Sequence, residues 1–347
     1  MQKDTIGIGI VGAGLMAGTY AETLAHYVKG ARLVAVAVGK RAPALADKYG
    51  VSHESSVDAL AARADVDGVI VTTPEIPRVA QVRVLAGAGK HLLLEKPMAV
   101  NIAEAEEMIR LCADARVRLM LVQSQRYRDI NLTAKQLIDE GAIGTVRQVR
   151  HVSMLGAEWA RKVLAERPFY ADPQGAGLLV SQLVHNLDMM RWLAGGGGAG
   201  ARVFAIVGGQ SGQGDLSVQA QFAFDNGVMG QTWVCMETPG AVFPESQFRL
   251  EVIGERGMLA GDAYSHLDYG MPDGTWQRVC TQEAFDPFNT ADPVRLRSFS
   301  RQNQEFVDCI REEREPGVTD KDGRASLALS LAVLESGRTG QVVRCRF

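Results

Sequence analysis

The chain has few cysteines, and none of them is placed for a cross-link or a metal site. The five lie scattered along its 347 residues with no Cys-x-x-Cys pair, at Cys112, Cys235, Cys280, Cys309 and Cys345. This spacing fits neither a zinc site nor the dense disulfide framework of a small secreted domain, so no metal ligands are predicted. We interpret the cysteines as buried thiols of a cytoplasmic protein, because the cytosol keeps thiols reduced.

The sequence also lacks a surplus of positive charge and a long apolar run. Its 37 Lys and Arg residues against 40 Asp and Glu give a formal net charge of −3, which argues against a nucleic-acid partner. No apolar run approaches the roughly 18 residues that a membrane-spanning helix needs, and the opening "MQKDTIGIGIVGAG" contains no signal-peptide cleavage site. We expect a soluble, cytoplasmic protein with neither nucleic acid nor membrane as a partner.

Chain length predicts two packed domains. The 347 residues exceed the usual size of a single hydrophobic core, and an apolar content of 46% can fill two. The pattern of apolar residues changes near residue 125. We therefore expect one domain at 1–124 and a second at 125–347.

The first domain alternates short β-branched runs with segments of helical period. Strands are predicted at 5–11, 32–38, 69–73, 90–95 and 118–123. Asn101, three residues before Glu104, predicts a capped helix start, and Gly50 predicts a helix end. Nearly continuous apolar strands that alternate with helices are typical of an α/β domain with a parallel sheet covered on both faces.

The second domain has longer strands separated by turns such as "FDNG". Strands are predicted at 145–153, 201–207, 217–224, 227–237 and 247–254. Helices are predicted at 130–141, 179–193, 301–313 and 324–336. The glycine-rich stretch at 194–200 follows no strand, which indicates a flexible loop rather than a phosphate site. The pattern favours an α/β domain with a large, mostly antiparallel sheet.

A glycine-rich turn follows the first predicted strand. The sequence "IGIVGAGLMAG" places Gly12, Gly14 and Ala17 in a G-x-G-x-x-A pattern between a strand and a helix. Gly12 allows the tight turn, Gly14 lets the backbone approach a pyrophosphate, and Ala17 allows close helix packing. This predicts a dinucleotide site that includes Leu15 and Met16. The alternative is a glycine-rich turn that binds nothing.

The end of the second strand lacks the acidic residue that usually binds the adenosine ribose of NAD. Its place is taken by Gly39, Lys40 and Arg41, which offer space and two positive charges to a 2′-phosphate. We therefore expect NADP as the cofactor, with NAD as the alternative. The two cations could equally form an ordinary solvated loop.

Opposite charges end the strand in "HLLLEKPMAV". In an open parallel sheet, ligands bind beyond the carboxyl ends of the strands, so we expect Glu95 and Lys96 to point into that crevice. Pro97 then turns the chain, and a cis peptide is one way to make such a turn. Arg126 and Tyr127 follow the next strand, where they could contact substrate or form an interdomain salt bridge.

Four segments together resemble the Gfo/Idh/MocA oxidoreductase family. They are the glycine turn with "TTP" at 72–74, "AGKHLLLEKP" at 88–97, "GAGLLVSQLVHNLD" at 175–188 and "DGRASLALSLAVLESGRTG" at 322–340. The resemblance implies a Rossmann domain at 1–124. It also implies a substrate-binding and oligomerisation domain at 125–347, whose open sheet forms a homodimer or homotetramer. Members mostly oxidise or reduce a carbinol carbon of small sugars, polyols and related cyclic compounds.

The same resemblance implies roles for individual residues. Lys96 matches the family lysine that contacts both the nicotinamide ribose and the reacting oxygen, and His185 matches the family histidine that acts as the base. Cofactor contacts are implied for Thr73, Pro74, Glu95, Lys96 and Pro97, and substrate contacts for Lys96 and His185. Substrate contacts of Arg126 and Tyr127 are predicted from their place after a strand, and that of Ser181 from its place one helix turn before His185.

The chain departs from the family pattern at two of its positions. Ser181 stands where the family usually has an Asp four residues before the histidine, and Arg78 stands where members often have a His. The spacing of four still places Ser181 and His185 on one helix face.

Three functions remain open at the level of sequence. The first is an NAD(P)-dependent dehydrogenase or reductase for a sugar, polyol or inositol-like substrate, with Lys96 and His185 as catalytic residues. The second is a cyclic dihydrodiol dehydrogenase, because Ser181 weakens any assumption that the substrate is a sugar. The third is a non-catalytic regulator that senses cofactor or sugar on the same fold. Retention of both Lys96 and His185 favours an enzyme.

Overall fold

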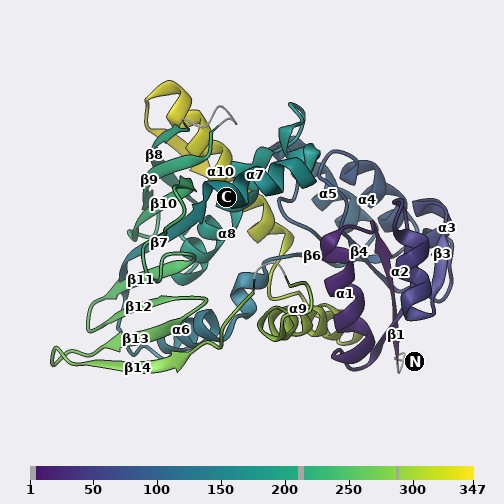
Figure 1. Ribbon diagram of the computed structural model, residues 1–347, viewed down its shortest axis with the longest axis horizontal. Helices are drawn as coiled ribbons and strands as arrows, with labels where there is room; N and C mark the ends of the chain where they lie inside the picture. Colours follow the sequence, from purple (N-terminus) through teal and green to yellow (C-terminus); the bar gives the residue numbers. More distant parts are fainter. Residues whose placement is uncertain (1–4, 210–214, 287–288) are drawn as a thin grey trace. The chain divides into compact units, whose positions relative to one another are not determined.

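Two compact units make up the chain (Figure 1), and the computed structural model describes residues 5–209, 215–286 and 289–347. Unit 1 comprises Met1–Tyr127 and Phe285–Arg324, and unit 2 comprises Arg128–Ala284 and Ala325–Phe347. The chain first passes from unit 1 to unit 2 after Tyr127, close to the predicted boundary after residue 124. Contrary to the prediction of two continuous domains, residues 285–324 belong again to unit 1. The domain boundary as a functional division stays a prediction.

Unit 1 is built on a six-stranded parallel sheet. Its strands are β1 (Ile6–Val11), β2 (Ala31–Ala37), β3 (Ser52–Glu54), β4 (Gly68–Val71), β5 (His91–Leu94) and β6 (Leu119–Leu121). The order is β3-β2-β1-β4-β5-β6, so the direction of winding reverses between β1 and β4. Every residue of β1 and β4 is buried, as expected of strands covered on both faces. The predicted α/β fold with a parallel sheet is confirmed, and ligands bind such sheets at the carboxyl ends where winding reverses.

The helices of unit 1 come from both parts of the chain. They are α1 (Leu15–His26), α2 (Ala42–Tyr49), α3 (Val57–Ala61), α4 (Arg78–Gly87), α5 (Ile102–Asp114), the 3₁₀ turn η1 (Ser124–Tyr127) and α9 (Pro293–Arg311). The late helix α9 packs on α1, where the rings of Tyr20 and Phe299 meet edge to face at 5.3 Å. Buried side chains of α9 therefore complete the same core cluster as those of α1 and β1.

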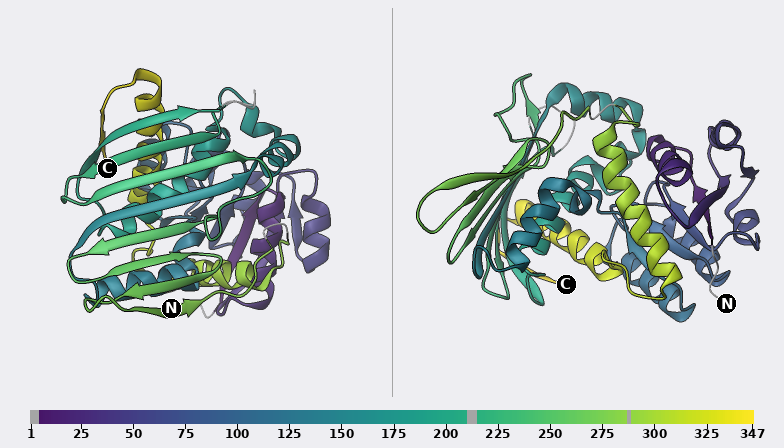
Figure 2. Two further views of the ribbon diagram at one scale, coloured as in Figure 1. Left: turned by 60° about the vertical axis from the view of Figure 1, so that its left-hand side comes forward. Right: turned by 90° about the horizontal axis from the view of Figure 1, so that it is seen from below.

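Unit 2 contains a nine-stranded mixed sheet (Figure 2). Its strands are β7 (Val146–Gly156), β8 (Gly200–Gly208), β9 (Ser217–Phe224), β10 (Met229–Thr238), β11 (Arg249–Gly254), β12 (Met258–Asp262), β13 (His266–Gly270), β14 (Trp276–Thr281) and β15 (Val343–Arg346). The order is β14-β13-β12-β11-β7-β10-β9-β8-β15, and all neighbours are antiparallel except β7 and β10. The prediction of a large, mostly antiparallel sheet is confirmed.

The helices of unit 2 lie against one face of this sheet (Figure 2). They are α6 (Asp129–Asp139), α7 (Ala157–Glu166), the 3₁₀ turn η2 (Pro168–Ala171), α8 (Gly177–Leu193) and most of α10 (Asp320–Thr339). Strand residues alternate between buried and exposed, most regularly in β8 and β9. This alternation is typical of a sheet with one face packed on helices and the other open.

Local signals in the sequence are confirmed where they are specific. The Asn101 side chain accepts a hydrogen bond from the Glu104 amide at 2.9 Å, and Gly50 ends α2 with a φ of 63°. No strand was predicted at the positions of β3, β12, β13, β14 or β15. The prediction also placed the start of α9 eight residues too late, because the start is fixed by Asp292, whose carboxylate caps the amides of Val294 and Arg295.

Candidate functional site

The predicted dinucleotide turn lies between β1 and α1, at the point where the winding of the sheet reverses. Gly12 has a φ of 100°, and a Cβ there would lie 2.5 Å from Thr72 Oγ1, so only glycine fits. Gly14 is exposed, and apart from its neighbours in the chain no heavy atom of the described residues lies within 4 Å of the place where its Cβ would be. It begins α1 without a side-chain cap, which leaves the first amides of the helix for an anion. These residues fit the pyrophosphate of a dinucleotide.

The end of β2 lies beside this turn. A Cβ on Gly39 would lie 3.4 Å from the amide nitrogen of Ala13. Gly39, Lys40 and Arg41 are all exposed, so the two cations face solvent next to the glycine turn. The chain leaves β2 through two residues of positive φ, Val38 at 66° and Gly39 at 102°. A positive φ is strained for a β-branched residue such as Val38.

The turn after β4 carries Thr73 and Pro74. Thr73 is buried, and its hydroxyl donates to Gln81 Oε1 of α4 at 2.6 Å. Its carbonyl accepts hydrogen bonds from the Arg78 guanidinium. Pro74 is half-buried. The turn is therefore fixed by the start of α4, beside the carboxyl end of β1.

The charged pair after β5 is divided between the interior and the surface. The Glu95 carboxylate is buried, and its Oε1 accepts a hydrogen bond of 2.7 Å from the hydroxyl of Tyr20. Its Oε2 accepts from the amide of Lys96 at 3.1 Å. The Lys96 residue is half-exposed, and the Lys96–Pro97 peptide is cis. The expectation that both charges point into the crevice therefore needs correction for Glu95, whose carboxylate instead holds the turn against α1.

Tyr20 is a partner that the sequence did not reveal. Burial raises the pKa of its phenol well above the usual value, and the charge of Glu95 raises it further. The phenol therefore keeps its proton and donates to Glu95. The two residues are 75 positions apart, and no local pattern connects a tyrosine in the middle of a helix with a glutamate after a strand.

Arg126 and Tyr127 lie in η1, after β6. Arg126 is buried, and its Nη2 lies 3.3 Å from the carboxylate of Asp322. Asp322 belongs to the returning segment of unit 1, so this ion pair lies within one unit. Tyr127 is half-buried, and its carbonyl accepts a hydrogen bond of 3.1 Å from Arg301. Contact of either side chain with substrate stays a prediction.

Ser181 and His185 lie one turn apart on α8, in unit 2. Ser181 is buried, and its hydroxyl is 3.2 Å from the hydroxyl of Tyr170 in η2. His185 is half-exposed, and its ring meets Phe248 edge to face at 6.5 Å. Where the resemblance implies an Asp, position 181 thus carries a hydroxyl that is hydrogen-bonded to the hydroxyl of Tyr170. Tyr170 could not be identified from sequence, because it lies in an irregular segment.

A second histidine, His151, contacts the same phenylalanine. The His151 ring, on β7, meets Phe248 edge to face at 4.1 Å and is fully buried. Burial lowers the pKa of His151 to about 3, so the ring is neutral at ordinary pH. Phe248 also contacts Tyr264, and the Arg128 guanidinium lies 4.3 Å from the centre of the Tyr264 ring. These rings form the packed interior beneath His185 in unit 2.

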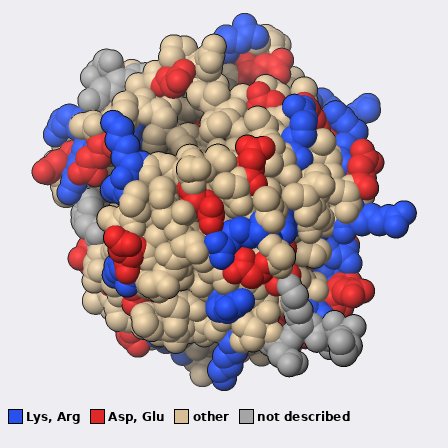
Figure 3. Space-filling model, turned by 90° about the vertical axis from the view of Figure 1, so that its right-hand side faces the viewer, with Lys and Arg blue, Asp and Glu red and all other residues tan. Residues whose placement is uncertain are grey.

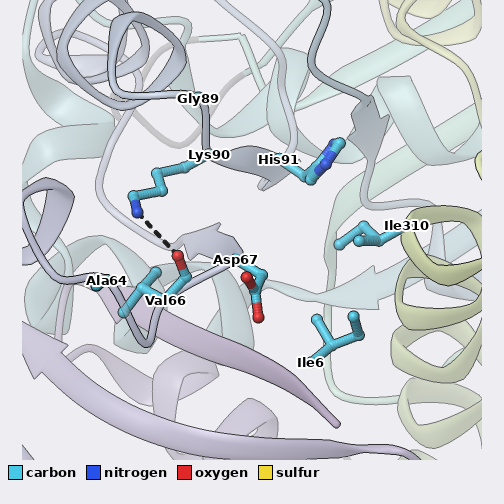
Figure 4. A pocket seen from close by; sticks show the side chains of 8 residues that line it. All are labelled: Ile6, Ala64, Val66, Asp67, Gly89, Lys90, His91 and Ile310. Atoms are coloured by element: carbon cyan, nitrogen blue, oxygen red, sulfur yellow. Dashed lines mark hydrogen bonds between the residues drawn. The ribbon is translucent and has the colours of Figure 1, made fainter. Parts of the chain in front are cut away.

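A cavity of about 270 Å³ lies at the opposite, amino-terminal edge of the sheet of unit 1 (Figure 4). Its polar side chains hold the ends of strands. Lys90 Nζ donates to the Val66 carbonyl at 2.9 Å, Asp67 Oδ2 accepts from a β1 amide at 2.9 Å, and His91 Nδ1 accepts from the Arg118 amide at 2.9 Å. Because small-molecule sites usually exceed about 300 Å³ and present free polar groups, this cavity is not the candidate site.

The surface shown in Figure 3 carries basic and acidic side chains interspersed. Oppositely charged side chains of the chain also pair, as Arg63 does with Glu54 at 2.6 Å. Across the described ranges, no helix is both long and apolar enough to cross a membrane.

Comparison with known proteins gives a consistent result over most of the chain. Residues 6–123 match the model of an oxidoreductase family with an NAD-binding Rossmann fold, and 131–260 match the GFO/IDH/MocA C-terminal domain. The inositol 2-dehydrogenase of Rhizobium meliloti (strain 1021) is 26% identical over 341 residues, which cover 96% of this chain and 97% of that enzyme. The 1,5-anhydro-D-fructose reductase of Ensifer adhaerens is 30% identical over 307 residues, which cover 87% of each.

The fold is also found among solved structures. An oxidoreductase from Agrobacterium radiobacter, in complex with NAD+, L-tartaric acid and magnesium, matches with a TM-score of 0.85 at 22% identity. The match covers 97% of this chain and 98% of that one. At this identity the likeness shows the fold.

Proposed function

Because the chain belongs to the Gfo/Idh/MocA family of oxidoreductases, we propose that it transfers hydride between a nicotinamide cofactor and a carbinol carbon of a sugar, polyol or inositol-like substrate. The observation that carries the proposal is the placement of Lys96. It follows β5 at the carboxyl edge of the sheet, on the same edge as the open glycine turn, and its backbone is anchored by the buried Glu95. The substrate class rests on the inositol dehydrogenase and anhydrofructose reductase among the relatives.

Lys96 and His185 have complementary roles in this proposal. When bound, the nicotinamide accepts the hydride from the carbinol carbon or returns it. Lys96 donates a hydrogen bond to the carbinol oxygen and stabilises the negative charge that grows there as the hydride leaves. His185 takes the hydroxyl proton as the base, because an imidazole changes charge near neutral pH. In the reverse direction it returns the proton to the carbonyl oxygen.

Ser181 modifies the action of His185 in this proposal. A carboxylate one turn before the histidine would stabilise imidazolium, whereas the Ser181 hydroxyl, hydrogen-bonded to Tyr170, carries no charge. Ser181 therefore gives the imidazolium of His185 none of the charge stabilisation that an Asp would supply.

The cofactor preference proposed for this chain is NADP. Lys40 and Arg41 are exposed beside the glycine turn, and no carboxylate at the end of β2 repels a 2′-phosphate. Arg41 can bind phosphate through parallel donors. The solved relative from Agrobacterium radiobacter holds NAD+, so the preference depends on these two side chains rather than on the family.

We further propose a cytoplasmic homodimer or homotetramer that assembles through the open face of the sheet in unit 2. That face exposes apolar side chains on several strands, among them Phe204 and Ile206 of β8, Met229 of β10, Ile253 of β11 and Met258 of β12. Exposed apolar residues that lie together on one face are typical of a protein interface. Sedimentation of the wild type and of Ile206→Arg tests this assembly.

A substrate panel tests the enzymatic function. Purified protein is incubated with NADP or NAD and with myo-inositol, aldonates, 1,5-anhydro sugars or cyclic diols, and nicotinamide absorbance is followed. Turnover of a polyol or sugar supports the proposal, whereas turnover of cyclic diols alone favours the dihydrodiol dehydrogenase. Cofactor binding without turnover of any compound contradicts the proposal and favours a regulator.

A further inference from the structure

Arg78 is the first residue of α4 and is almost completely buried, with 2% of its surface exposed. A buried guanidinium is costly unless its N–H groups are hydrogen-bonded. Its donors point at the backbone of two separate turns. They therefore connect the start of α4 to the segments that carry the predicted site residues.

The first turn held by Arg78 follows β4. Its Nε donates to the carbonyl of Thr73 at 3.0 Å, and its Nη2 donates to the same oxygen at 2.7 Å. The Thr73 hydroxyl is held separately by Gln81. Arg78 and Gln81 both belong to α4, so this one helix fixes the backbone and the side chain of the turn.

The second turn held by Arg78 contains Lys96. Its Nη1 donates to the carbonyl of Glu95 at 2.6 Å and also to the carbonyl of Pro97. These two carbonyls flank Lys96 on either side. The amide of Lys96 is bound in turn by the Glu95 carboxylate. The backbone of Lys96 is thus held on both sides, while its half-exposed side chain extends from a fixed base.

We propose that Arg78 is a positioning residue that sets the location of Lys96 relative to the turn at Thr73 and Pro74. This role rests on the proposed function of Lys96. In the proposal Arg78 touches neither substrate nor cofactor, and it acts through the backbone carbonyls of these two turns. The guanidinium suits this task because it presents several donors in a rigid plane and can bind three carbonyls of two turns together. The ammonium group of a lysine, by contrast, presents its three donors from a single nitrogen and cannot span the same carbonyls.

The test compares Arg78→Lys and Arg78→Gln with the wild type. Arg63→Gln is the matched control. Arg63 is also an arginine of unit 1 that makes several hydrogen bonds, but its guanidinium donates to the carboxylates of Asp65 and Glu54 and not to backbone carbonyls. The first measurement is hydrogen exchange of peptides that cover residues 94–98, followed by mass spectrometry. We expect the Lys96 amide to exchange at least about tenfold faster in both Arg78 variants, because opening of the turn frees it. The control leaves this rate unchanged.

The second measurement is steady-state turnover of myo-inositol, or of the panel compound that the wild type uses best. Small misplacement of a group at a reacting centre can lower the rate by about a hundredfold. We expect kcat to fall about tenfold to a hundredfold in Arg78→Gln, and less in Arg78→Lys. The Kd for NADPH should change less than kcat does, because the glycine turn that would hold the pyrophosphate stays intact while the turns at Thr73 and Lys96 loosen. Arg63→Gln keeps kcat.

Each outcome decides the proposal. Unchanged exchange of the Lys96 amide, or an unchanged kcat in Arg78→Gln, overturns it. A variant whose kcat falls only in proportion to its folded fraction, measured by calorimetry, shows a purely structural role and also overturns it. If the wild type turns over no panel compound, the proposed function fails, and amide exchange alone then decides whether Arg78 holds Lys96.

Discussion

His151 makes the stability of unit 2 depend on pH in a way that can be calculated. The ring lies on β7 with 1% of its surface exposed, and neither nitrogen has a hydrogen-bond partner within the described part of the chain. Burial lowers its pKa to about 3, whereas the unfolded chain has the ordinary value of about 6.5. The unfolded state therefore binds the proton first as the pH falls. The stability that neutral His151 contributes is present above pH of about 6.5 and is lost as the pH falls towards 3.

The size of this loss follows from the two pKa values. Between pH of about 7 and about 5, protonation of the unfolded chain lowers the free energy of unfolding by about 2 kcal/mol. In that interval the folded ring stays unprotonated, so the figure depends on the unfolded pKa and hardly on the folded one. Replacement by leucine, which has a similar volume and does not titrate, removes the dependence. At neutral pH it should leave stability equal or higher, because it also removes a buried ring whose two nitrogens have no hydrogen-bond partner among the described residues.

Tryptophan fluorescence can follow this effect in unit 2 alone. All four tryptophans belong to that unit, at Trp159, Trp192, Trp233 and Trp276. Urea unfolding of the wild type and His151→Leu at both pH values should show a wild-type loss about 2 kcal/mol larger. His53→Gln is the control, because His53 is exposed in unit 1. An equal loss of stability in His151→Leu and the wild type would refute the reasoning.

Three further predictions concern the proposed reaction. Lys96→Met should lower kcat by more than about tenfold to a hundredfold while the fold survives, and a variant that keeps most of its kcat contradicts the role of Lys96. Val38→Asp should shift preference from NADPH to NADH in fluorescence titrations, because it adds a carboxylate at the end of β2 and Asp tolerates the positive φ of 66° better than Val does; unchanged preference argues against this strand end as the 2′-phosphate site. Ser181→Asp should raise the pKa of His185 and move the acidic limb of the pH–rate profile to higher pH, whereas Tyr170→Phe, which adds no charge, serves as the comparison. If the acidic limb persists in His185→Ala, another group is the base.

Much of unit 1 could be predicted because its signals are local. Alternation of apolar runs with helical segments predicts parallel strands, and the strict demand for glycine at Gly12 is visible as a motif before a helix. The mostly antiparallel sheet of unit 2 was predicted from closely spaced strands joined by turns, which are also local signals. Short edge strands such as β14 carry mostly exposed residues and therefore lack the apolar pattern that identifies a strand.

The candidate site was only partly accessible from sequence. Its position at the carboxyl ends of strands follows from the topology of any open parallel sheet. The orientation of Glu95 did not follow, because a charged residue after a strand is usually expected at the surface. It is buried here because Tyr20, on a different element, offers it a hydrogen bond. Tyr170 and the hydrogen bonds of Arg78 were missed for the same reason. Tyr170 meets Ser181 only through the fold, and Arg78 binds backbone carbonyls, which every residue has.

The sequence by itself determined the alternation of strands and helices in unit 1 and the glycine turn, and it offered Lys96 and His185 as candidate residues through the family resemblance. These depend on hydrophobic period, backbone conformation and side-chain type, which are properties of neighbouring residues. Only the tertiary structure decided that α9 returns to the core of unit 1 and that Arg78 binds the turns after β4 and β5. Such contacts depend on which buried polar groups meet after packing, and each donor must then find an acceptor that no local pattern specifies.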